Sequence, residues 1–139
     1  MPENKYAKYK MIEFFKSTIL NNSIANYIYN APHTTNSNDI FNAFDTIIIN
    51  QTYNKMYFIQ FCNRKHLSNT IATHNLLTDR NLYIISPQIE YYIVTWDRLS
   101  KYAYARNNYR FQCFQIIIDD ANKRIFTKLI YDTINDKQI

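Results

Sequence analysis

The chain has 139 residues, of which 47% are hydrophobic, and its sixteen Lys and Arg against eleven Asp and Glu give a formal net charge of +5. This size and apolar content predict one globular domain over residues 1–139 and exclude a disordered chain. The absence of glycine excludes a P-loop and a dinucleotide fingerprint. The basic excess favours a polyanionic partner without establishing one.

The hydrophobic runs are too short for a membrane span, and the polar N-terminus does not resemble a signal peptide. We therefore expect an intracellular protein that does not enter a membrane. Cys62 and Cys113 lie inside apolar runs and are expected to be free buried thiols. Ile, Asn, Tyr and Lys are abundant, which suggests an AT-rich genome such as that of a virus or plasmid, so the compartment could be a host cell.

In chain order, hydrophobic periodicity and turn residues predict three helices and a set of short strands. The expected helices cover residues 4–20, 66–79 and 97–107. The expected strands cover residues 24–29, 44–49, 56–62, 81–86, 88–96, 112–118 and 124–131, and the tail after residue 131 should fray. This order predicts a mixed α+β (α/β) fold with one central mixed sheet and helices on its faces.

The stretch from Phe44 to Arg64 is the most informative part of the chain. Two apolar runs, 44–49 and 56–62, are joined by an Asn-rich link and predict a β-hairpin. Asp45 opens the first strand, and Gln60 and Cys62 share one face of the second because side chains two apart on a strand point the same way. Two such strands can deliver polar side chains to one point.

Other chemistries fit the residues less well. The three histidines and two cysteines never approach zinc-ligand spacing. A nucleophilic Cys62 paired with a histidine would need a thiol in mid-strand, where cysteine usually belongs to the core. Metal-dependent phosphodiester cleavage instead needs hard oxygen ligands for Mg²⁺ and a base near the attacking water.

The hairpin with its flanking helices resembles the restriction-endonuclease-like, PD-(D/E)xK, nuclease superfamily, and within it the archaeal Holliday-junction resolvases. The similar features are the leading helix, a short strand, the FDTIII strand with its Asp, the KMYFIQF strand and a helix after it. The resemblance implies a restriction-endonuclease-like fold, a Mg²⁺ cofactor and a DNA partner that includes branched DNA. It assigns Asp45 and Gln60 as metal ligands, Cys62 to the lysine position, and Glu13 as the candidate for an additional helix carboxylate.

Two positions depart from the family pattern. Gln60 offers an amide oxygen without charge, and Cys62 cannot replace a lysine ammonium that neutralises developing phosphate charge. Arg64, two residues further along the same face, would supply a cation and completes the predicted catalytic set with Asp45 and Gln60. These departures leave two activities open: a weak Mg²⁺-dependent deoxyribonuclease, or a DNA-binding protein that has lost cleavage.

Basic residues beside the hairpin and along the segment after residue 96 are the expected phosphate contacts. These nucleic-acid-binding candidates are Arg64, Lys65, Arg98, Lys101, Arg106 and Arg110. The alternative function is a non-enzymatic interaction or structural protein, for instance a viral one, because the thirteen tyrosines could form a surface that pairs with other chains. This alternative predicts self-association, and a homodimer is compatible with the nuclease-like function as well.

Overall fold

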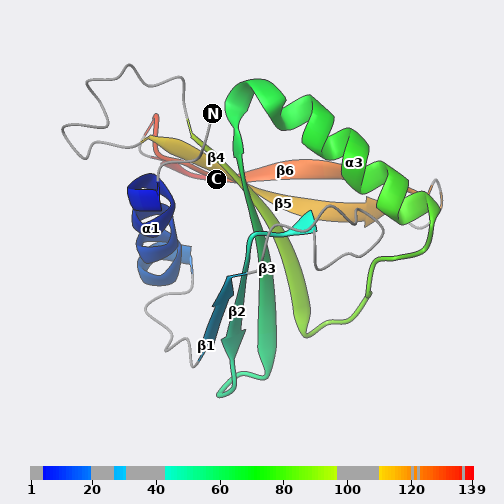
Figure 1. Ribbon diagram of the computed structural model, residues 1–139, viewed down its shortest axis with the longest axis horizontal. Helices are drawn as coiled ribbons and strands as arrows, with labels where there is room; N and C mark the ends of the chain where they lie inside the picture. Colours follow the sequence, from blue (N-terminus) through cyan, green and yellow to red (C-terminus); the bar gives the residue numbers. More distant parts are fainter. Residues whose placement is uncertain are drawn as a thin grey trace.

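The computed structural model describes residues 5–19, 27–30, 43–96, 110–119, 121, 123–135 and 137–139 (Figure 1). The helical elements in this part of the chain are α1 (Lys5–Phe14), η1 (Phe15–Ile19), η2 (Arg64–His66) and α3 (Leu67–Asp79). The strands are β1 (Tyr27–Asn30), β2 (Thr46–Asn50), β3 (Lys55–Asn63), β4 (Ile89–Trp96), β5 (Phe111–Asp119), β6 (Arg124–Asp132) and β7 (Lys137–Gln138).

These strands form a mixed sheet whose spatial order follows the sequence from β1 to β7. Strands β3 and β4 are parallel, and the other neighbouring pairs are antiparallel. A parallel pair cannot be joined by a tight turn, so the chain returns through a crossover, which here contains α3. The prediction of a mixed α+β fold with one central sheet is therefore confirmed.

The two helices pack against opposite faces of the sheet (Figure 1). Met11, Ile12 and Phe15 from the N-terminal helical segment join one apolar cluster with alternate residues of the central strands. Leu67 and Ile71 of α3 pack on the second cluster. Its buried members come from the opposite residues of the strands and from the β2 entry: Phe44, Ile47, Phe58, Cys62, Tyr91, Ile93, Ile116 and Ile125. The period-two alternation along each strand produces this division.

Several sequence predictions match these elements. The helices over 4–20 and 66–79 correspond to α1 with η1 and to α3, and the central hairpin corresponds to β2 and β3. Both cysteines are free and buried, as expected. No helix in the described ranges has the length and apolar character needed to cross a membrane. The helix predicted over residues 97–107 lies outside the described residues.

Two predictions were wrong. Residues 81–86 do not form a strand: Asn81 has a positive φ of 55°, and Leu82 N donates to Leu77 O at the end of α3. This bond keeps the start of the segment beside the helix, and the segment has no strand partner among the described residues. The tail also does not simply fray, because Lys137–Gln138 pair with β6 as β7. The turn before β7 is held by Asp132, whose carboxylate accepts from Ile134 N and Asn135 Nδ2.

The packing of Phe58 provides a test of the α3-side core. Phe58 is fully buried, and its ring centroid lies 5.7 Å from that of Phe44 and 5.4 Å from that of Tyr91. We expect Phe58→Ala to lower the free energy of unfolding by about 3–5 kcal/mol through lost burial and an unfilled cavity. Chemical denaturation measures this, with Tyr53→Ala as the control because Tyr53 is 65% exposed. Equal effects of both substitutions would contradict the packing.

Candidate functional site

Asp45 lies at the entry to β2, one position beyond the Thr46–Ile59 pair of the β2–β3 ladder. Its backbone N donates to Ile59 O at 3.0 Å, and its Oδ2 accepts from Phe61 N at 2.7 Å. The carboxylate therefore takes the place of a backbone carbonyl on the neighbouring strand. A charged acceptor on a half-buried amide makes a strong bond, so Asp45 fixes the β2 entry against β3 as well as carrying the predicted negative charge.

Gln60 is the neighbour of Phe61 on β3, and its side chain points to the α3 side of the sheet. Gln60 Oε1 lies 2.6 Å from His74 Nε2, and the other ring nitrogen of His74, Nδ1, is hydrogen-bonded to the Tyr83 hydroxyl. An amide oxygen can only accept, so Nε2 carries the proton and donates to Gln60, while Nδ1 accepts from Tyr83. Three residues from β3, α3 and the following segment thus form one chain of hydrogen bonds.

The imidazole of His74 is held in its neutral form. Burial lowers the pKa of His74 to about 4, and Phe44 lies against its ring at a centroid distance of 5.0 Å. The same burial raises the pKa of Tyr83, so its hydroxyl keeps its proton. Both groups are therefore fixed in the states that the hydrogen-bond chain needs at neutral pH. Because the amide oxygen of Gln60 faces His74, its amide nitrogen faces away from the imidazole.

Cys62 is buried in the apolar cluster under α3. Its position two residues beyond Gln60, on the same face, agrees with the predicted strand alternation. Glu13 is exposed on α1, and its Oε1 lies 3.9 Å from Lys16 Nζ. Because α1 packs on the other face of the sheet, the structure does not bring Glu13 to the α3 side on which Gln60 lies.

The cations Arg64 and Lys65 lie in η2, directly after β3, and both side chains are exposed. Asn63 Oδ1 accepts from Lys65 N at 3.2 Å and fixes this turn. Arg110 is exposed and directly precedes β5, and its Nη1 donates to Ile134 O at 3.0 Å. Arg98, Lys101 and Arg106, the other predicted phosphate contacts, lie outside the described residues.

Arg64, Lys65 and Arg110 come from the same end of the sheet, which we call the basic end. Asn63 pairs with Trp96, and Trp96 pairs with Phe111, so β3 ends and β5 begins on either side of the end of β4. Arg64 and Arg110 therefore leave the sheet about two strand spacings apart, or about 10 Å. Asp45 lies near the same end, because β2 begins where β3 approaches its last residues.

The residues at this site offer few oxygens to a Mg²⁺ ion. A Mg²⁺ centre needs several oxygen ligands and usually more than one charged group. One oxygen of Asp45 is bonded to Phe61 N, the oxygen of Gln60 accepts from His74, and Cys62 is a soft, buried ligand. Within the described residues, no group of three or more His, Cys, Asp or Glu side chains could hold a metal ion together. The assignment of Asp45 and Gln60 as metal ligands thus stays a prediction.

The roles of His74 and Tyr83 were not predicted from the sequence. His74 lies in the helix predicted over residues 66–79 and is buried, but its contact with Gln60 spans fourteen residues. One signal for this contact was available in the sequence. His74 lies on the inward face of a helix that directly follows a strand with an inward glutamine, Gln60. No family model, curated protein or solved structure matches this chain.

The burial of His74 predicts how stability depends on pH. The ordinary pKa of histidine is 6.5, so the unfolded chain binds a proton at higher pH than the folded protein. The free energy of unfolding should be greatest above pH 6.5 and fall by about 3 kcal/mol as the pH decreases to about 4. Denaturant titrations across this range measure the slope.

His74→Gln should flatten this pH dependence, because it removes the titrating group from the core. His66→Gln is the matched control, since His66 is exposed in η2. A slope that is the same in His74→Gln as in the unsubstituted protein would show that His74 is not the group responsible.

Proposed function

We propose that this protein binds DNA through the basic end of its sheet and that it has a restriction-endonuclease-like fold with weak or lost cleavage. The observation that carries the proposal is the position of Arg64, Lys65 and Arg110, which are exposed at one end of the sheet beside Asp45 and Gln60. Exposed cations whose backbones leave the sheet about 10 Å apart can contact phosphates of the same DNA molecule. The formal net charge of +5 favours the same partner.

The order of elements supports the nuclease-like fold. The leading helix α1, the short strand β1, the Asp-bearing entry to β2, strand β3 and helix α3 follow one another as the resemblance requires. Asp45 and Gln60 lie on adjacent strands near one end of the hairpin. Parallel pairing of β3 with β4 then places the basic turn η2 at the carboxyl end of both strands.

The side chains at the site favour binding over cleavage. With its oxygen bonded to His74, Gln60 turns its amide N–H groups away from the imidazole, and these can donate to a phosphate oxygen. Arg64 and Lys65 add positive charge nearby. Cys62, at the position of the family's lysine, is buried and gives no cation to stabilise a developing charge. We infer that the protein holds the phosphodiester without efficiently activating water against it.

Removing the cations of η2 tests DNA binding. The double variant Arg64→Gln/Lys65→Gln should bind short duplex and branched DNA more weakly. The slope of log affinity against log salt concentration should also become less negative by about two, because two phosphate contacts disappear. Fluorescence anisotropy at several salt concentrations measures both quantities.

The matched control is Arg124→Gln/Lys128→Gln, which also removes one exposed Arg and one exposed Lys. Arg124 starts β6 at the opposite end of the sheet, opposite Asp119. The control lowers the net charge equally, so an equal loss of affinity in both double variants would indicate nonspecific attraction and contradict a binding site at the basic end.

Cleavage is tested by restoring a carboxylate. Gln60→Glu places a second carboxylate near Asp45, and we expect it to increase nicking of supercoiled or branched DNA with Mg²⁺ or Mn²⁺ above the unsubstituted protein. Adding Asp45→Asn should abolish the gain, because an amide oxygen still accepts from Phe61 N but has no charge. If Gln60→Glu causes no metal-dependent change in cleavage, the assignment of positions 45 and 60 to the family motif fails.

A further inference from the structure

The hydrogen bonds that join Gln60, His74 and Tyr83 have a direction, and Tyr83 sets it. Among the described residues, the Tyr83 hydroxyl has one hydrogen-bond partner, His74 Nδ1. Because a half-buried hydroxyl places its proton on an acceptor, Tyr83 donates and Nδ1 accepts. The proton of the neutral imidazole is then on Nε2, which donates to Gln60 Oε1 at 2.6 Å. The donor and acceptor at each contact therefore follow from the phenol at the end of the chain of bonds.

The reverse direction lacks an acceptor at the Tyr83 end. If His74 carried its proton on Nδ1, this nitrogen would donate to the Tyr83 oxygen, and the Tyr83 proton would need another acceptor. Within the described part of the chain, no second acceptor is bonded to this hydroxyl. The amide of Gln60 would also have to rotate, so that its nitrogen donated to Nε2 and its oxygen faced away from the imidazole. Tyr83 therefore determines which end of the Gln60 amide is left for a ligand.

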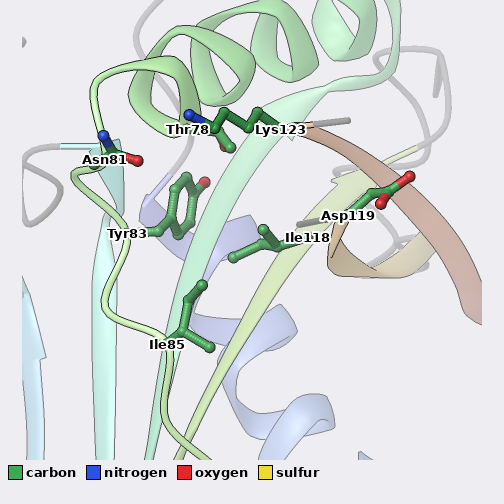
Figure 2. Close-up of a pocket in the computed structure, with 7 residues that line it drawn as sticks. All are labelled: Thr78, Asn81, Tyr83, Ile85, Ile118, Asp119 and Lys123. Carbon is green, nitrogen blue, oxygen red and sulfur yellow. The ribbon is translucent and has the colours of Figure 1, made fainter. Parts of the chain in front are cut away.

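Tyr83 is held in place through both of its neighbours. Leu82 N donates to Leu77 O at 3.0 Å, and Ile84 O accepts from the Tyr91 hydroxyl at 2.6 Å. The ring centroids of Tyr83 and Tyr91 lie 4.9 Å apart. Figure 2 shows Tyr83 in the wall of a cavity of about 140 Å³, with its hydroxyl on the side of the ring that is nearer α3. These contacts keep the hydroxyl at the imidazole.

The imidazole is confined as well. His74 is 1% exposed, and the ring centroids of Phe44 and Tyr83 lie 5.0 Å and 5.9 Å from its own. Close packing on both sides opposes a rotation that would exchange the two ring nitrogens, so Nε2 stays toward Gln60. Gln60 is half-buried, and its amide nitrogen has no hydrogen-bond partner among the described residues. This nitrogen is the donor that Gln60 offers to a ligand.

We propose that Tyr83 is a positioning residue for DNA binding, which acts through His74 to present the Gln60 amide N–H groups to a phosphate oxygen. This inference rests on the proposed function, because the phosphate is that of a DNA strand bound at the basic end. It adds a chemical selection at position 60. The free end of the amide donates, so the group that it binds must be a hydrogen-bond acceptor. A cation would need the amide oxygen, which His74 already occupies.

The direction of these hydrogen bonds can be measured without DNA. We expect a long-range ¹H–¹⁵N correlation spectrum of the full chain at neutral pH to show His74 with a protonated Nε2 and an unprotonated Nδ1. The spectrum of His74→Gln identifies its signals among those of the three histidines. A His74 that carries its proton on Nδ1, or on both nitrogens, overturns the inference.

The effect on binding is measured by fluorescence anisotropy with a short DNA duplex. Gln60→Leu should weaken binding about tenfold, because it removes a hydrogen bond to a charged phosphate. Tyr83→Phe removes only the hydroxyl and should weaken binding at least about threefold, because the Gln60 amide can then rotate. Tyr92→Phe is the matched control, since the Tyr92 hydroxyl donates to Glu90 Oε1 at 2.6 Å on the other face of the sheet. It should leave the affinity unchanged.

A double variant separates positioning from a structural role. In the Gln60→Leu background, Tyr83→Phe should cause no further loss of affinity, because no amide remains to be oriented. An equal loss in both backgrounds overturns the inference, as does an equal loss in Tyr92→Phe or normal binding by either Tyr83→Phe or Gln60→Leu. All these outcomes leave the proposed function standing, since DNA is still bound. A protein that does not bind DNA overturns the proposed function and this role of Tyr83 together.

Discussion

The position of α3 on the sheet depends on a neutral histidine buried between two partners. His74 donates to Gln60 on β3 and accepts from Tyr83 in the segment that follows the helix. Because β3 and β4 are parallel, the chain must cross the sheet between them, and this hydrogen-bond chain ties the crossover helix α3 to β3. A neutral imidazole can satisfy one acceptor and one donor at once, whereas a charged one would have two donors and could not accept from Tyr83. The burial that lowers the pKa of His74 is therefore a condition of this geometry.

The same histidine determines what Gln60 can offer. A glutamine amide has an acceptor end and a donor end, and His74 occupies the acceptor. One carboxylate oxygen of Asp45 is likewise engaged in a hydrogen bond, because it replaces a backbone carbonyl in the β2–β3 ladder. Because oxygens of Gln60 and Asp45 already accept hydrogen bonds within the fold, few oxygens remain to coordinate a metal ion. The Gln60 amide N–H groups, together with Arg64 and Lys65, are suited to bind an anion. This difference is the physical basis for proposing DNA binding without efficient cleavage.

The sequence predicted those parts of the fold that local patterns control. The 44–49 and 56–62 runs predicted the hairpin, and the hydrophobic periodicity of residues 66–79 predicted α3. The same β-branched pattern over residues 81–86 led to a wrong strand, because strand formation needs a neighbouring edge and the start of this segment is bonded to the end of α3. The bond between Gln60 and His74 could not be predicted from periodicity, since it depends on the crossing angle of a helix over the sheet. The pairing of residues 137–138 with β6 likewise depends on a turn held by Asp132.

The two ends of β4 differ in their neighbours. The basic end follows Trp96, where Asn63 and Phe111 lie on either side, whereas Ile89 at the other end of β4 pairs with Met56 of β3 and with no residue of β5 among the described residues. Arg64 and Arg110 therefore leave the sheet where three neighbouring strands are held in register by backbone hydrogen bonds. The strand ladder thus sets the spacing of their backbone positions, and the proposed contact with phosphates uses charges whose points of attachment stay in a fixed relation to one another.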